Sequence, residues 1–231
     1  MNNNIINVAI DGPAGAGKST VARGAAKQLG YIYVDTGALY RAIGVNALRN
    51  GVDTKDKAAV AASLDGVKVN LVFENGEQKV MLNGEDVSVE IRTPEASMAA
   101  SDVSAVPEVR AFLFNLQRDI AKRNSCIMDG RDIGTVVLPQ AQVKIFLTAS
   151  PEIRAERRYK ELIEKWSEVD YQSVLDDIVK RDYNDSHREI APLKPAEDSV
   201  LFDTTGLALD ESVAAITKII KEKICLLYTS P

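Results

Sequence analysis

The feature that most constrains the fold of this chain is a glycine-rich segment near its beginning. Residues 12–19 are Gly-Pro-Ala-Gly-Ala-Gly-Lys-Ser, which matches the pattern G-x4-G-K-[ST]. An apolar run at 5–10 precedes the segment, and a stretch with helical character, 18–29, follows it before Gly30. Between a strand and a helix this pattern binds phosphate, because backbone N–H groups and the helix N-terminus face the anion. The segment therefore predicts a site for a nucleoside triphosphate.

Two side chains of this loop carry specific roles. Lys18 can reach the β- and γ-phosphates, and the Ser19 hydroxyl can ligate Mg2+, with phosphate oxygens and water supplying most of the remaining ligands. We expect the nucleoside triphosphate to contact Gly12, Pro13, Ala14, Gly15, Ala16, Gly17, Lys18, Ser19 and Thr20, together with Arg157 and Arg158.

Strands and helices alternate along the rest of the chain. Short apolar, β-branched runs predict five core strands, at residues 5–10, 31–34, 125–128, 143–148 and 200–203. Helical stretches separate most of them, and such alternation favours a parallel, doubly wound sheet. The expected fold class is α/β, with a five-stranded parallel sheet of the P-loop NTPase type flanked by helices.

Residues 67–89 have a different character. Two alternating segments are followed by Asn-Gly pairs at 75–76 and 83–84, which is a strong hairpin signal. We expect a small antiparallel sheet of two or three strands inserted in the β-α chain. An alternative is that this insert only decorates the surface.

The expected organisation is a single domain over residues 1–223. Its parts are a core at 1–62, 96–149 and 191–223, an acceptor-binding insert at 63–95 and a helical lid at 150–190. Asp210 is expected to cap the last helix, which should run to about Lys223. The tail 224–231 does not continue the amphipathic period cleanly, so we expect little order and no function there.

Charge and composition exclude several classes of protein. The formal net charge is −5, which argues against a general nucleic-acid binder. No apolar run of transmembrane length and no signal peptide is visible, and only two cysteines are present. We expect a cytoplasmic monomer without membrane or nucleic-acid partners. A GTPase switch is disfavoured, because no N/T-K-x-D motif follows a later strand.

Arginines supply the second anion pocket that a small-molecule kinase needs. Arg131 follows the third predicted strand, at the edge of the sheet where ligands bind. A helix opened by Ser150 and Pro151 places Arg154, Arg157 and Arg158 on one face, and a second helix does the same for Arg181, Asp185 and Arg188. Val174, Leu175, Ile178 and Val179 should be buried. Arginine forks suit phosphoryl transfer, and mobile helices that carry them would close as a lid and exclude water.

Several segments together resemble bacterial cytidylate kinases. They are residues 12–20, 35–41 (Asp-Thr-Gly-Ala-Leu-Tyr-Arg), 84–87, 91–93, 129–137 (beginning Asp-Gly-Arg-Asp) and the pair Arg181-Asp182 with Arg188. The resemblance runs from about Ile5 to Lys223. It implies that CMP is bound by Thr36, Arg41, Ser101, Arg110, Arg131, Asp132, Arg181, Asp185 and Arg188. Many relatives have Ser where Thr36 stands, a change that keeps the hydroxyl.

Within that resemblance, Arg41, Arg131 and Arg188 would hold the acceptor phosphate. Ser101, Arg110 and Asp132 would contact the cytosine edge, and Arg181 and Asp185 the ribose. The implied reaction is Mg2+-dependent, in-line transfer from ATP to CMP or dCMP, with Lys18, Arg131 and Arg188 as the catalytic residues. The alternatives are a related kinase that acts on UMP or a non-nucleotide, and a nucleotide-binding switch without transfer activity.

Overall fold

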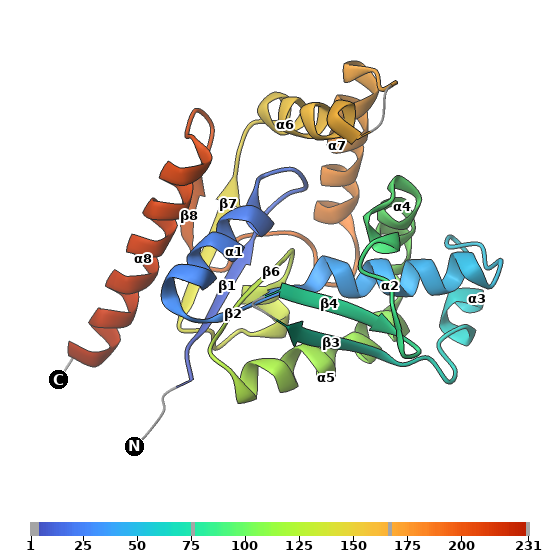
Figure 1. The fold of residues 1–231 in the computed structure, drawn as a ribbon, viewed down its shortest axis with the longest axis horizontal. Coiled ribbons are helices and arrows are strands. Elements are labelled where there is room, and N and C mark those ends of the chain that lie inside the picture. Colours follow the sequence, from blue (N-terminus) through green and yellow to red (C-terminus); the bar gives the residue numbers. More distant parts are fainter. Residues whose placement is uncertain (1–4, 75–76, 166–167, 230–231) are drawn as a thin grey trace. The chain divides into compact units, whose positions relative to one another are not determined.

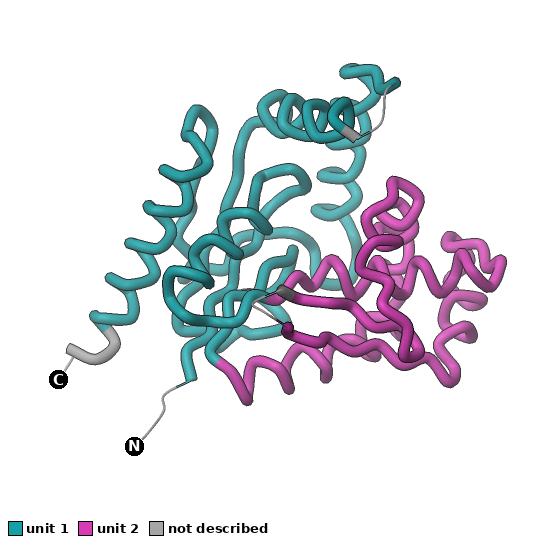
Figure 2. Tube along the Cα trace, in the orientation of Figure 1, with its two compact units in different colours: residues 1–33, 125–231 teal, residues 34–124 magenta. Residues whose placement is uncertain are grey.

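The computed structural model of this chain describes residues 5–74, 77–165 and 168–229. Two compact units divide the chain (Figure 2). Unit 1 comprises residues 1–33 and 125–231, and unit 2 comprises residues 34–124.

Unit 1 is built around a mostly buried sheet. Its order is β2-β6-β1-β7-β8, and β2 has its last two residues in unit 2. The strands are β1 (Asn7–Asp11), β2 (Ile32–Asp35), β6 (Cys126–Gly130), β7 (Val143–Thr148) and β8 (Val200–Asp203). The helical elements of unit 1 are α1 (Lys18–Leu29), η2 (Ile133–Val137), α6 (Pro151–Lys165), α7 (Tyr171–His187) and α8 (Leu209–Thr229).

The predicted fold class is confirmed by this sheet. β1 pairs in parallel with β6 and β7, and β7 pairs in parallel with β8. Val8 and Ile10 of β1 are fully buried, as expected for a central parallel strand covered on both faces. In Figure 1, α1 and α8 lie side by side, and their apolar side chains join those of β1 and β7 in one core. Parallel strands end together at one edge, which therefore gathers the loops after β1 and β6.

Helices α6 and α7 form a pair with a small core of its own (Figure 1). Ser150 caps α6 as expected, since its hydroxyl accepts the Ile153 N–H at 3.3 Å. Val174 and Ile178 are buried between the helices, as predicted, and Leu175 is partly buried. The prediction for Val179 is wrong: its side chain is 51% exposed, because it lies beside the buried stripe of α7 and not within it.

Unit 2 combines helices with a three-stranded antiparallel sheet of order β3-β4-β5. Its elements are α2 (Thr36–Arg49), α3 (Lys57–Ala62), β3 (Val69–Glu74), β4 (Glu77–Leu82), β5 (Glu85–Asp86), η1 (Glu90–Arg92), α4 (Pro94–Val103) and α5 (Pro107–Arg123). This unit is wider than the insert expected at 63–95, because α2, α4 and α5 contribute to the same core.

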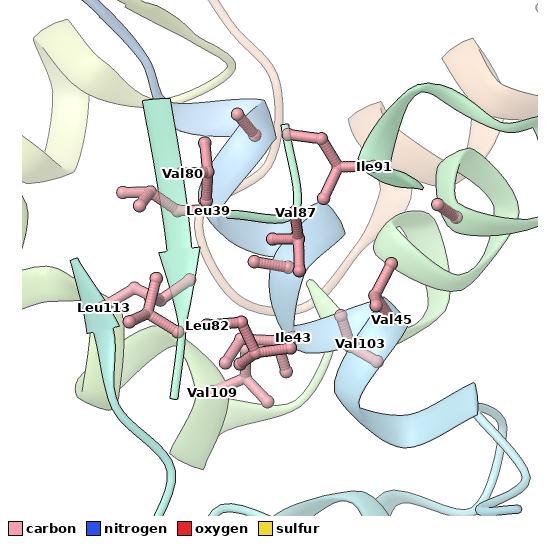
Figure 3. Close-up of a cluster of buried hydrophobic side chains, with 14 of the residues drawn as sticks. Leu39, Ile43, Val45, Val80, Leu82, Val87, Ile91, Val103, Val109 and Leu113 are labelled. Carbon is pink, nitrogen blue, oxygen red and sulfur yellow. The ribbon is translucent and has the colours of Figure 1, made fainter. Parts of the chain in front are cut away.

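The insert is part of that core and not a surface decoration, so the alternative weighed from the sequence is wrong. Val80, Leu82 and Val87 are at most 2% exposed and pack with Leu39 and Ile43 of α2 (Figure 3). The period-2 pattern thus buries one face of the hairpin. The pair at 75–76 lies outside the described residues, whereas the pair at 83–84 forms a turn in which both residues have positive φ, 52° and 90°.

The end of the chain corrects two expectations. α8 continues to Thr229 where little order was expected from 224 onward, because Ile224 packs against the core that α8 shares with α1. Asp210 lies inside the first turn of α8 and not at its cap, since the helix begins at Leu209. No helix in the described part of the chain is both long and apolar enough to span a bilayer.

The packing of the insert generates a stability prediction. Leu82→Ala should lower the free energy of unfolding by about 2–5 kcal/mol, because it leaves a cavity between β4 and α2. Leu48→Ala is the matched control, since Leu48 is 46% exposed on α2. Urea unfolding followed by circular dichroism would measure both. Equal, small losses for the two variants would show that the insert contributes little to the core.

Candidate functional site

The phosphate-binding loop lies where β1 ends, and it approaches β7 closely. Gly12 has φ 149°, and a Cβ on it would lie 1.9 Å from the carbonyl oxygen of Leu147. No other residue fits between the two backbones without moving one of them. The loop then enters α1 through Gly17, whose left-handed conformation (φ 86°) starts the helix at Lys18. The predicted strand–loop–helix context is therefore present.

Lys18 has a buried ammonium group within this loop. Its side chain is inside the protein, and Nζ donates to the carbonyl oxygen of Pro13 at 2.7 Å. Burial, and then the positive charge of Arg131, lower the pKa of Lys18 to about 7, although Asp129, Asp185 and Asp11 act in the opposite direction. An anion bound in the loop would favour the charged form of the Lys18 amine and so offset both burial and repulsion by Arg131.

Ser19 and Asp129 bring two hard oxygen donors together. The Ser19 hydroxyl donates to Oδ2 of Asp129 at 2.9 Å, and the Tyr33 hydroxyl donates to the other carboxylate oxygen at 2.9 Å. Mg2+ usually takes one or two protein oxygens and completes its octahedron with phosphates and water. This donor set fits such an ion. No motif in the sequence points to Tyr33, which reaches Asp129 from the neighbouring strand.

Asp11 is a buried carboxylate that the motif analysis did not include. It accepts the N–H groups of Ile133 and Gly134 at 2.8 and 2.7 Å and so fixes the first turn of η2, directly after Asp132. Burial raises the pKa of Asp11 to about 6, against the opposing effect of these two hydrogen bonds. The sequence did contain a signal for Asp11, because this carboxylate ends an apolar strand directly before the phosphate loop.

Two ion pairs cross between the end of β6 and the end of α7. Arg131 donates from Nε to Asp185 at 2.7 Å, and Arg188 lies 3.3 Å from Asp132 through Nη2. Arg188 also donates from Nε to the Ala191 carbonyl at 2.7 Å. The Arg131 and Arg188 charges hold the pKa of Asp185 below its usual value, despite the opposing effect of burial. The structure thus brings together four predicted acceptor-side residues, and the Arg181 charge also acts on Asp185.

The three arginines of α6 do not share one role. Arg154 is 3% exposed and points its guanidinium at the carbonyl of Ala14 and at Asp182 of α7. Arg157 lies beside the loop: its Nη1 would be 3.9 Å from a Cβ on Gly17, and it also binds Thr204.

Arg158 points elsewhere. It is paired with Glu161 of its own helix at 3.0 Å, and its side chain is 36% exposed. The α6 arginines therefore have different partners: Arg154 is turned to protein oxygens inside the molecule, whereas Arg158 forms its ion pair at the helix surface.

Within unit 2, α2 positions two of the predicted residues. Thr36 is its buried first residue, and Arg41 follows just over one turn later. Arg41 donates to Asp35 Oδ2 at 2.8 Å, and Arg92 lies 3.8 Å from the same oxygen. These two arginines hold the pKa of Asp35 below its usual value, against the effect of burial. One carboxylate therefore gathers two guanidinium groups at the N-terminus of α2.

The other two residues of unit 2 that were predicted to bind CMP lie on α4 and α5. Arg110 of α5 is buried, with its guanidinium 5.9 Å from the centre of the Tyr40 ring. Ser101 lies on α4, which packs against α2. Tyr40 had no role in the sequence analysis, although it stands in the segment 35–41 on which the resemblance partly rests.

Comparison with known proteins gives a consistent result. A family model described as Cytidylate kinase matches residues 8–222. The cytidylate kinase of Caldicellulosiruptor bescii is 49% identical over 223 residues, covering 95% of this chain and 99% of its own. That of Lactobacillus johnsonii is 52% identical over 221 residues, covering 96% of each chain. A crystal structure of an uncharacterized protein from Eubacterium ventriosum aligns with a TM-score of 0.51 at 14% identity, covering 94% of this chain and 98% of that one, which supports the fold alone.

The contact between Gly12 and β7 predicts the effect of adding a single methyl group. Gly12→Ala should lower the free energy of unfolding by at least about 2 kcal/mol more than Gly206→Ala. Gly206 is the matched control, because it also has positive φ (83°) but no atom within 4 Å of its would-be Cβ. Thermal unfolding of the two variants separates steric overlap from backbone strain. Similar melting temperatures would contradict the close approach at Gly12.

Proposed function

The chain belongs to the cytidylate kinase family, and we propose that it transfers the γ-phosphoryl group of ATP to CMP and dCMP. The products are ADP with CDP or dCDP. The observation that carries the proposal is the register of β1 and β6, which places Gly130 beside Asp11 and so brings Arg131 to the edge of the sheet where the phosphate loop begins. A cation that the resemblance assigns to the acceptor phosphate therefore lies close to the lysine that the motif assigns to the donor phosphates.

We propose that the loop residues 12–20 hold the donor phosphates through backbone N–H groups and the N-terminus of α1. Lys18 would contact the β- and γ-phosphates, and Arg157, which lies beside Gly17, would add a charge on the donor side. The role expected for Arg158 requires it to leave Glu161.

The acceptor assignment follows the resemblance. Arg131, Arg188 and Arg41 would hold the phosphate of CMP, and Arg181 and Asp185 its ribose. Asp132, Ser101 and Arg110 would contact the cytosine edge, and Thr36 is the last member of the proposed set. Four of these side chains are already held in the ion pairs Arg131–Asp185 and Arg188–Asp132, here called the crossed pairs. This lowers the entropic cost of ordering them when CMP binds.

Ser19 and Asp129 are the residues we propose for Mg2+. When bound, the ion would neutralise charge on the donor phosphates and orient them. Phosphoryl transfer needs little acid–base chemistry, so the protein acts by placement and charge. Lys18, Arg131 and Arg188 would stabilise charge on the transferred group as it moves in line from ADP to the CMP phosphate, with no covalent intermediate.

A coupled assay of ADP release tests the function directly. With ATP and Mg2+ present, ADP should form with CMP and dCMP, and far more slowly with UMP, AMP, GMP or no acceptor. A preference for UMP would identify a related kinase with another acceptor. ADP release independent of any acceptor would identify an ATP-hydrolysing switch and overturn the proposal.

Asp132 provides a test of base selection. A carboxylate accepts a hydrogen bond from the exocyclic amino group of cytosine, but it faces a carbonyl in uracil. Asp132→Asn should lower the ratio of kcat/KM for CMP to that for UMP by about tenfold or more, because an amide can also donate. Asp198→Asn is the control, since the Asp198 side chain is exposed and pairs with Lys144. An unchanged ratio would remove Asp132 from the base site.

Lys18 predicts a pH dependence of nucleotide binding. Its pKa of about 7 means that the amine is mostly neutral at pH 8 in the free protein. Phosphates restore the charged form, so ADP binding at pH 8 should take up about 0.9 proton, and the uptake should fall toward zero near pH 6, where the amine is already charged.

Calorimetry in buffers of different ionisation enthalpy measures this uptake. Lys18→Arg is the control, because a guanidinium stays charged and should take up no proton at pH 8. Wild-type binding at pH 8 without proton uptake would contradict the lowered pKa of the lysine.

A further inference from the structure

Arg154 is a buried guanidinium for which the proposed reaction has no use. It lies in the first turn of α6 and is 3% exposed. Nε donates to the carbonyl of Ala149 at 2.8 Å, and Nη1 donates to the carbonyl of Ala14 at 2.9 Å. The fork also holds Asp182 of α7 by two bonds, at 3.1 and 2.6 Å. One side chain therefore joins the phosphate loop to α7.

The bond to Ala14 fixes the orientation of one peptide unit of the loop. In a trans peptide the C=O and N–H groups point in opposite directions. Holding the Ala14 oxygen toward Arg154 turns the N–H of Gly15 to the other side, away from α6. Arg154 also packs directly against the loop, since a Cβ on Gly15 would lie 3.2 Å from Cβ of Arg154. A shift of α6 would therefore disturb the loop.

The bond to Asp182 fixes α7 in the same way. Asp182 stands between Arg181 and Asp185 on one rigid helix, and Asp185 holds Arg131 at 2.7 Å. A two-bond arginine–carboxylate pair has a defined geometry as well as a favourable energy. Because Arg154 is buried, movement of α7 away from the loop would leave its charge without the Asp182 partner, which is costly.

We infer that Arg154 is a positioning residue that couples occupancy of the phosphate loop to the placement of α7 and its acceptor-side residues. The inference rests on the proposed function, in which ATP and CMP are the two ligands. Arg154 acts on the donor through the Ala14 peptide and on the acceptor through Asp182. The contact to Asp182 can be changed while the contact to Ala14 is kept.

The experiment measures, by calorimetry, the affinity for CMP with and without a non-hydrolysable ATP analogue. The ratio of the two dissociation constants is the coupling factor, expected to be about fivefold or more in the wild type. Asp182→Asn keeps Arg154 and its bond to Ala14, so analogue affinity should stay within about threefold while the coupling factor falls toward one. Arg154→Lys replaces the fork by one ammonium group that cannot hold Ala149, Ala14 and Asp182 together, so analogue affinity should fall about tenfold and coupling should also be lost.

Glu156→Gln is the matched control, because it removes an exposed ion pair with Lys160 on the same helix and should leave both quantities unchanged. Thermal unfolding checks that each variant is folded; if Arg154→Lys is not, the coupling factor of Asp182→Asn decides. A wild-type coupling factor of one, an Asp182→Asn factor equal to wild type, or unchanged analogue affinity in folded Arg154→Lys would overturn the inference. Failure of the proposed function would instead appear as wild-type protein that forms no ADP in response to CMP.

Discussion

Charged groups buried at the carboxyl ends of β1 and β6 are the constraint on which the rest of unit 1 depends. The Lys18 ammonium group is removed from water and close enough to Arg131 to be repelled, so burial and repulsion disfavour its charged form. The nearby carboxylates of Asp11, Asp129 and Asp185 offset this only in part. A triphosphate supplies the missing negative charge. The site thus holds its cations in position before the ligand arrives, and little reorganisation remains when charge moves between phosphates.

Sequence signals that lie within an element were sufficient to predict that element. α1 and β7 occupy the predicted residues, because Gly30 ends α1 in a left-handed conformation and β7 is a short apolar run. η2 had no such signal, since its first turn is fixed by backbone N–H groups that donate to the carboxylate of Asp11, 122 residues away from Ile133. The end of α8 was also missed, because the contact of Ile224 with the core is tertiary. α3 and α4 were not expected either; their Asp56 and Thr93 caps are weak evidence without the partner that each helix packs against.

The site was predictable where a motif fixes the backbone and less so where side chains pair over long distances. Lys18 and Ser19 lie as the loop pattern requires, and Arg131 ends its strand as expected. The partners of the arginines were not predictable, because helical spacing tells which residues share a face but not what that face meets. Arg154 illustrates this: its spacing from Arg157 suggested a common anion surface, whereas packing of α6 on Gly15 turned it toward a carbonyl and a carboxylate.

The phosphate loop and the Arg131–Asp185 and Arg188–Asp132 pairs would hold their anions in different ways in the proposed reaction, and the difference bears on selectivity. The loop offers backbone dipoles and one lysine, which any polyphosphate can engage. Arg131 and Arg188 are instead already paired with Asp185 and Asp132. In the proposed reaction a phosphate that takes these arginines frees two shielded carboxylates, which is costly unless they gain new donors. A nucleotide brings such donors in its ribose hydroxyls and its base amino group. Water and inorganic phosphate bring few, so in the proposed reaction these two ion pairs would favour a complete nucleotide over both.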